Sequence, residues 1–185
     1  MKRRRYWFPK PYADFVARLR VPGGILLAVA FLWLATPSLQ SLAWGMPVAL
    51  AGLLLRGWAA GHLAKNTSLA TGGPYAYLRN PLYAGTLLTA LGLAAASRRV
   101  ELAVLVGLVF GLVYLPVIEL EEQHLRNLFP EYAAYAERVP LLWPRRPAVR
   151  PQARFSWRLY LRNQEYQALG GFLLAAAVLL WKTPA

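Results

Sequence analysis

The stretch LAVLVGLVFGLVYLPVI, residues 102–118, has no charged side chain and runs directly into ELEEQHLRNLFPEYAAYAERVPLLWP, residues 119–144. A long uncharged apolar run is typical of a membrane-spanning helix, which needs ~20 residues and is completed here by the residues that flank the run. Four other stretches have the same character: residues 21–35, 42–55, 82–96 and 168–181. The sequence therefore predicts an all-α integral membrane bundle of about five transmembrane helices, in which the span at 168–181 is the least well supported.

The composition of the 185 residues agrees with a membrane protein. Hydrophobic residues make up 57% of the chain and charged residues only 16%, against about 25% charged residues in ordinary soluble domains. The chain has no Cys and only two His, His62 and His124, so the ligand types that most often hold transition metals are scarce. We expect one membrane domain over residues 1–185 and no metal centre.

Basic residues gather on one side of a five-pass arrangement. Lys and Arg total 21 against 8 acidic residues, a net charge of +13. Seven of the basic residues lie in residues 1–20, eight lie in residues 119–167, and Lys65 and Arg79 precede the third apolar run. Because loops rich in Lys and Arg remain in the cytoplasm, we predict that the N-terminus and these polar loops are cytoplasmic and that the C-terminus is outside. Binding of anionic membrane lipids is enough to explain this positive charge, and nucleic acid is not expected as a partner.

The N-terminal segment, residues 1–20, precedes the first apolar run. Its residues 6–20, YWFPKPYADFVARLR, mix aromatic and basic side chains. That mixture is typical of a helix lying in the membrane interface. A flexible tail is the alternative interpretation.

The first polar stretch of chemical interest is TSLATGGPYAYLRNPLYAG, residues 67–85, between the second and third apolar runs. Asn80 followed by Pro81 predicts a helix N-terminus with Pro at its first position. Such a terminus favours a ligand carboxylate or phosphate, and Arg79 adds a bidentate donor beside it. Three tyrosines in the stretch offer rings that stack on a base or face a cation: Tyr75, Tyr77 and Tyr83. The alternative is a tight loop of interfacial tyrosines whose arginine binds lipid phosphate.

The second polar stretch places three carboxylates, Glu119, Glu121 and Glu122, where the fourth apolar run ends. Helical spacing predicts that Glu119 and Glu122 share one face and that Glu121 lies with Leu125 toward packing. Partners for these acids are Arg79, Arg56, Lys65 or a bound nucleoside, and solvated charge at a helix end is the alternative. We expect the helix to be interrupted at Pro130.

Two further features lie within or beside the apolar runs. Arg56 interrupts the second run; a charged residue there is either part of a site or extends to the headgroups. Two GxxxG pairs, Gly57 with Gly61 and Gly107 with Gly111, predict close packing of helix backbones.

In their order and spacing, LATGGPYAYLRNPLYAG and EEQHLRNLFPEYAAYAERVPLLWP resemble the membrane-embedded methyltransferases that include isoprenylcysteine carboxyl methyltransferase and the bacterial phospholipid-methyltransferase-like proteins. The resemblance covers about residues 53–145, the expected methyltransferase-like core, and leaves residues 146–185 as a C-terminal extension with the last helix. It implies S-adenosylmethionine bound at the cytoplasmic end of the bundle and a lipophilic acceptor entering from the bilayer.

The resemblance also assigns residues to roles. We expect catalytic parts for Arg79, Tyr83 and Glu122. The residues expected to bind the cofactor are Gly73, Tyr75, Tyr77, Arg79, Asn80, Pro81, Tyr83, Gly85, Glu121, Glu122 and Leu125. The resemblance implies all of these except Tyr77 and Asn80, which are expected from their place in the first polar stretch. Asn80 and Thr67 stand where the prenylcysteine enzymes have histidine, which weakens the assignment of a prenylcysteine substrate.

The expected function is therefore methyl transfer from S-adenosylmethionine to a prenylated carboxylate, a phospholipid amine or another isoprenoid-like compound. Two alternatives are an NADPH-dependent enzyme similar to sterol reductases, which have a comparable loop, and a non-catalytic membrane protein that binds lipids or a partner.

Overall fold

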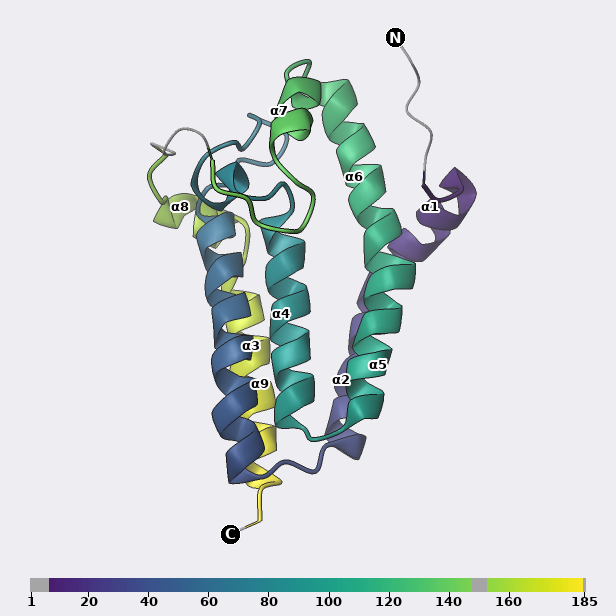
Figure 1. Cartoon of the computed structure of the whole chain (residues 1–185), viewed down its shortest axis with the longest axis vertical. Helices are drawn as coiled ribbons and strands as arrows, with labels where there is room; N and C mark the ends of the chain where they lie inside the picture. Colours follow the sequence, from purple (N-terminus) through teal and green to yellow (C-terminus); the bar gives the residue numbers. More distant parts are fainter. Residues whose placement is uncertain (1–6, 148–152, 185) are drawn as a thin grey trace.

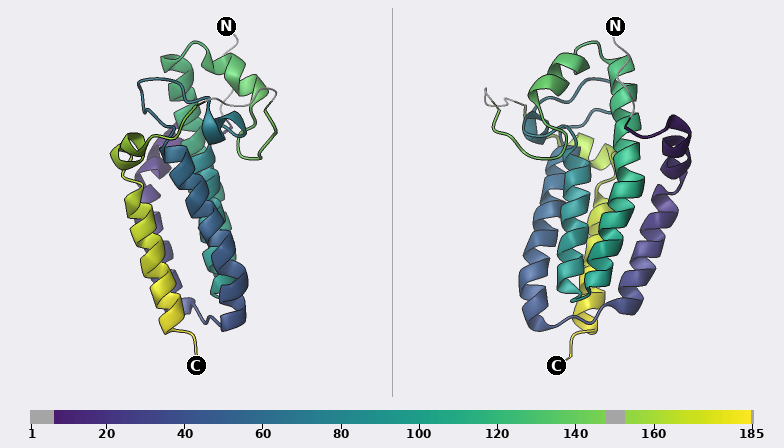
Figure 2. Two further views of the ribbon diagram at one scale, coloured as in Figure 1. Left: turned by 90° about the vertical axis from the view of Figure 1, so that its left-hand side faces the viewer. Right: turned by 45° about the vertical axis from the view of Figure 1, so that its right-hand side comes forward.

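The computed structural model describes residues 7–147 and 153–184. Every regular element in these two ranges is helical, which confirms the all-α prediction. Long helices run side by side as a bundle (Figures 1 and 2). They are α2 (Arg20–Leu34), α3 (Leu39–Ala60), α4 (Pro81–Ala96), the continuous rod of α5 (Val100–Val109), η2 (Phe110–Tyr114) and α6 (Leu115–Leu128), and α9 (Tyr166–Trp181). Each of the five apolar runs lies largely within one of them.

Two of these helices are long and apolar enough to cross a membrane, namely α3 and the rod Val100–Leu128. A third span is formed if α1 (Lys10–Arg18) and α2, which meet at a bend of 54°, are counted as one. The helices α4 and α9 are apolar but have only 16 residues each. The chain is therefore a helical membrane protein, and the expected number of five crossings stays a prediction.

The connections at the two ends of the bundle differ in length. At one end, short links join α2 to α3 and α4 to α5, and α9 ends there (Figure 1). At the other end lie α1, the 3-10 turn η1 (Gly73–Ala76), α7 (Tyr132–Arg138) and α8 (Trp157–Arg162). The two polar stretches predicted from the sequence thus meet at the same end. That this end faces the cytoplasm stays a prediction.

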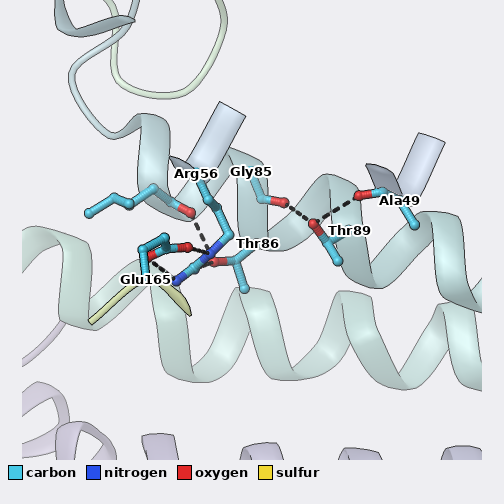
Figure 3. Close-up of polar contacts among 7 residues, drawn as sticks. Ala49, Arg56, Gly85, Thr86, Thr89 and Glu165 are labelled. Carbon is cyan, nitrogen blue, oxygen red and sulfur yellow. Dashed lines mark hydrogen bonds and ion pairs between the residues drawn. The ribbon is translucent and has the colours of Figure 1, made fainter. Parts of the chain in front are cut away.

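The most extensive contact between helices in the described residues is the close packing of α3 against α4. A Cβ on Gly52 would lie 2.4 Å from the Thr89 amide nitrogen, and a Cβ on Gly92 would lie 2.3 Å from that of Ala49. Thr89 Oγ1 donates to the carbonyl of Gly85 at 2.8 Å and to that of Ala49 at 3.3 Å (Figure 3). Backbones at this separation leave no room for larger side chains.

The GxxxG pairs predicted from the sequence are not the ones that bring helix backbones together. A Cβ on Gly107 or Gly111 would have no atom within 4 Å among the described residues, so no other helix backbone packs against the rod at these two glycines. Gly57 and Gly61 lie beneath the rings of Tyr160 and Phe155 rather than against another helix backbone. The packing role predicted for these glycines is therefore wrong for Gly107 and Gly111.

The N-terminal segment is held on the rod. The backbone N–H groups of Trp7 and Phe8 donate to the Glu119 carboxylate at 2.7 and 3.0 Å, and Tyr12 Oη donates to the Leu112 carbonyl in the π turn at 2.6 Å. Val16 is buried in the same segment. Residues 7–18 are thus not a flexible tail, while residues 1–6 lie outside the described residues. The position of the N-terminal segment in the membrane interface stays a prediction.

Candidate active site

A cavity of about 610 Å³ opens where the polar loops meet the bundle, within the range of ~300–1,000 Å³ found for small-molecule sites. Both polar stretches contribute to its wall: the first through Tyr75, Arg79 and Tyr83, and the second through Glu121 and Leu125. The other lining residues are Arg20, Arg56, Leu63, Ala64, Lys65, Asn66, Ser68, Leu69, Ala70, Leu82, Thr86, Tyr114, His124, Phe129, Tyr135, Asn163 and Glu165. Six predicted site residues do not line the cavity: Gly73, Tyr77, Asn80, Pro81, Gly85 and Glu122.

Glu122 holds the Arg79 side chain on the side away from the cavity. The Arg79 Nε lies 3.0 Å from Glu122 Oε1, and each side chain is about 7% exposed. This contact is an ion pair without hydrogen-bond alignment, since the buried Nε has no hydrogen-bond partner. Arg79 Nη1 donates to the Ala136 carbonyl at 2.9 Å. Glu122 therefore orients Arg79 toward the cavity and does not reach the cavity itself.

The start of α4 is hydrogen-bonded to the segment that follows α7. The helix begins at Pro81 with Asn80 as N-cap, as predicted. The Asn80 side chain does not cap the helix; its Nδ2 lies 3.4 Å from both Glu122 Oε1 and the Leu141 carbonyl. The amides of Arg79 and Asn80 donate to the carbonyls of Pro140 and Leu141 at 2.8 and 3.2 Å. These two amides are thus already occupied by the protein and are not available to a ligand anion.

Glu121 faces the cavity rather than the packed core. Tyr83 Oη donates to Glu121 Oε1 at 2.6 Å, and Arg20 Nη1 lies 3.6 Å from the same oxygen and donates to Tyr83 Oη at 3.3 Å. The Glu121 side chain is 49% exposed. The predicted pairing of Glu121 and Leu125 on one helix face is right, because both line the cavity, but the prediction that this face is packed is wrong. The sequence did not identify Arg20 as a site residue, because a basic residue at the end of an apolar run is already explained by the orientation of the helix in the membrane.

The helix α7 contributes Tyr135 to the wall of the cavity and is called the cover below. It follows the break at Pro130 that the sequence predicted, since α6 ends at Leu128. Tyr135 Oη donates to the Tyr75 carbonyl at 2.7 Å, and the Arg126 guanidinium lies 5.2 Å from the centre of the Tyr132 ring. Burial raises the pKa of Tyr75, Tyr132 and Tyr135 well above the usual value for tyrosine. All three hydroxyls are therefore protonated donors at neutral pH.

The glycines and Tyr77 of the first stretch shape the site from outside. Gly73 has a φ of +55°, and a Cβ there would lie 2.5 Å from His62 Cδ2, so only glycine fits without strain. Gly85 packs on Gly52 between α3 and α4. The Tyr77 ring lies 6.1 Å from that of Trp58, and the Tyr77 carbonyl accepts from the Arg145 amide at 2.9 Å.

A partly buried ion pair forms another wall of the cavity. Arg56 Nε and Nη2 donate to the two carboxylate oxygens of Glu165 at 2.6 and 3.0 Å, and Nη1 contacts Thr86 Oγ1 (Figure 3). Arg56 was predicted as a candidate. Glu165 was missed, although it is the only acidic residue after Glu137 and directly precedes the last apolar run.

A family model described as phospholipid methyltransferase matches residues 20–132, which is more than half of the chain. The chain belongs to the phospholipid methyltransferase family. This confirms the predicted resemblance to membrane methyltransferases, and membership points to a methyltransferase. The matched range contains Arg20, Arg56 and Arg79. It also contains Glu121 and Glu122, and it ends before α8 and α9.

Among curated proteins, the chain is similar to two bacterial metal-resistance proteins and one eukaryotic methyltransferase. It is 36% identical over 121 residues to the cobalt-zinc-cadmium resistance protein CzcN of Cupriavidus metallidurans, covering 64% of this chain and 54% of that protein. It is 34% identical over 125 residues to the nickel-cobalt-cadmium resistance protein NccN of Alcaligenes xylosoxydans xylosoxydans, covering 66% and 57%. It is 36% identical over 72 residues to phosphatidylethanolamine N-methyltransferase B of Dictyostelium discoideum, covering 37% and 34%.

This chain thus aligns with about half the length of the two metal-resistance proteins. No solved structure gives a significant match. Within residues 7–147 and 153–184, no group of three or more His, Cys, Asp or Glu side chains is arranged to hold a metal ion.

Proposed function

We propose that this member of the phospholipid methyltransferase family transfers a methyl group from S-adenosylmethionine to a lipophilic acceptor at the membrane surface. The observation that carries the proposal is the convergence of the two polar stretches on one cavity. Arg79 and Glu122, 43 positions apart in the sequence, lie 3.0 Å apart, and Tyr83 and Glu121 lie 2.6 Å apart. One small molecule in the cavity can therefore touch both stretches.

The side chains of the cavity fit the parts of S-adenosylmethionine. A methionine carboxylate needs a cation, and Arg79 presents its guanidinium, an anion-binding fork. An ammonium or a ribose hydroxyl needs an acceptor, and the half-exposed Glu121 provides one. A flat base needs apolar and aromatic surface, which Tyr75, Leu125 and Phe129 supply. We assign these five residues to the cofactor.

Bound S-adenosylmethionine supplies an electrophilic methyl group on a positively charged sulfur. The contribution of the protein is positional: holding an acceptor atom and a methyl carbon in line at about 3–3.5 Å is worth roughly 7–11 kcal/mol. Glu122 acts here as a positioning residue that holds Arg79, and the cover made by α7 limits access of water to the cavity. When the acceptor is an amine or a hydroxyl, the hydrogen-bonded pair of Tyr83 and Glu121 offers the nearest path for its proton.

The acceptor reaches the cavity from the lipid between α2, α4 and the rod. Arg20, Tyr83 and Tyr114 line the cavity on this side, and the rings of Tyr83 and Tyr114 meet edge to face at 5.9 Å. Aromatic rings with polar tips are suited to the headgroup level of a membrane. The acceptor class remains a prenylated carboxylate, a phospholipid amine or another isoprenoid-like compound. Family membership favours methyl transfer over the NADPH-dependent alternative.

The test uses the full chain purified in mild detergent. We expect S-adenosylhomocysteine to raise the melting temperature and NADPH to leave it unchanged, and we expect a labelled methyl group to pass from S-adenosylmethionine to a component of a lipid extract. Arg79→Ala and Glu122→Gln should each weaken S-adenosylhomocysteine binding and turnover. Asp14→Asn, which breaks an exposed pair with Lys10, is the matched control. Stabilisation by NADPH would support the reductase alternative, and a response to neither ligand would support a non-catalytic protein.

A further inference from the structure

The wall of the cavity is rich in cations. Arg20, Arg56, Lys65 and Arg79 all line it. Three of these cations have an acidic partner: Glu121 for Arg20, Glu165 for Arg56 and Glu122 for Arg79. The chain has only 8 acidic residues in a background of +13, yet three of them are paired with cations of this wall. Such a placement indicates that the charge of the wall matters to what it binds.

Arg56 would place an unbalanced charge on the wall of the cavity if it were unpaired. Its side chain is 24% exposed and that of Glu165 is 6% exposed, so water screens their charges less than those of Arg20 and Glu121. A guanidinium does not lose its proton in a protein. Without Glu165, a full positive charge would therefore remain on the cavity wall at Arg56.

Glu165 comes from a part of the chain that the family model does not match. It precedes α9 at the N-cap position, beyond the matched residues 20–132. Neighbouring contacts hold it in place, since Asn163 Nδ2 donates to the carbonyls of Ala60 and Leu63 at 2.9 and 2.8 Å. The C-terminal extension thus delivers one acid to the cavity and fixes its position against the end of α3.

We propose that Glu165 neutralises Arg56 so that the cavity accepts a positively charged ligand, which makes the C-terminal extension part of the ligand-binding site. This inference rests on the proposed function, because the ligand concerned is the sulfonium form of the cofactor. A space of about 610 Å³ is roughly 10 Å across. At an effective dielectric constant near 20, two unit charges ~10 Å apart change a binding constant by roughly tenfold.

The experiment compares two ligands that differ in one charge. S-adenosylmethionine has a positive sulfur, whereas S-adenosylhomocysteine has a neutral one and is otherwise the same except for the methyl group. The Kd of each is measured by calorimetry on the full chain in detergent, for the unmodified protein, Glu165→Gln and the double variant Arg56→Gln/Glu165→Gln. Asp14→Asn is again the control, for the loss of an acid that does not line the cavity.

We expect Glu165→Gln to weaken S-adenosylmethionine binding by about tenfold more than S-adenosylhomocysteine binding. The double variant, which removes both charges, should return the ratio of the two Kd values to within about threefold of that of the unmodified protein. A merely structural role of Glu165 would weaken both ligands equally, and that result would overturn the inference. An unchanged ratio would overturn it as well.

A second variant keeps the test valid if Glu165→Gln does not fold. Thr86→Lys adds a cation at the same wall while leaving Arg56 and Glu165 in place, and it should shift the ratio in the same direction. A Thr86→Lys protein with an unshifted ratio would contradict the electrostatic reasoning. If the unmodified protein binds neither ligand, the proposed function fails and this inference falls with it. If it binds both and the ratio does not respond, only this inference fails.

Discussion

Replacing Tyr135 by Phe removes a single hydroxyl from the cover of the cavity and keeps the ring. That hydroxyl donates to the Tyr75 carbonyl at 2.7 Å, and both residues are buried. The variant leaves the carbonyl without this donor in a place with little access for water, and an unsatisfied buried acceptor costs about 1–3 kcal/mol. Because the bond joins α7 to η1, we expect the loss to appear as easier opening of the cover, with the open fraction raised by roughly 5- to 150-fold.

Hydrogen exchange in detergent measures this opening directly. Amides of residues 132–139 should exchange faster in Tyr135→Phe, and the melting temperature should fall. The control is Tyr12→Phe, which removes another tyrosine-to-carbonyl bond of 2.6 Å, but at an exposed site on the rod. That bond joins α1 to the rod and does not involve α7, so the control should leave the exchange of the α7 amides unchanged. Equal exchange of the α7 amides in both variants and the unmodified protein would refute the assignment of this bond as the fastening of the cover.

Two further predictions concern packing and pH. Gly92→Ala should destabilise the fold by about 1–3 kcal/mol, since the new Cβ would lie 2.3 Å from the Ala49 amide nitrogen. The control is Gly107→Ala, whose Cβ meets no atom within 4 Å and which should be neutral or slightly stabilising. Equal melting temperatures for the two variants would contradict this prediction. The raised pKa values of Tyr75, Tyr132 and Tyr135 predict a loss of stability in alkali. The unfolded chain releases these protons near pH ~10 while the folded chain retains them, so the melting temperature in detergent should fall as the pH rises above ~10. A melting temperature that stays constant to pH ~11 would show that these hydroxyls are not buried.

The helices and the start of α4 could be predicted from the sequence because their causes are local. An uncharged apolar run becomes a helix wherever it lies in a membrane, since its backbone polar groups must bond within the segment. Asn80 and Pro81 mark a helix start through the backbone geometry of the two residues themselves. The break at Pro130 has the same local origin.

What only the tertiary structure decided is what each polar side chain faces. The sequence put Glu121 and Leu125 on one face of a helix, but it could not say that this face borders a cavity, because that depends on where α2, α4 and α7 are packed. It singled out Arg56 without its partner, since Glu165 lies 109 positions further along the chain and an ion pair across such a distance leaves no local pattern. It also named Gly107 and Gly111 for packing instead of Gly52 and Gly92, because spacing gives the face on which a glycine lies and not the neighbour that covers it. Local rules thus determined the helices and their ends, whereas the charge and the shape of the cavity arise from contacts between distant segments.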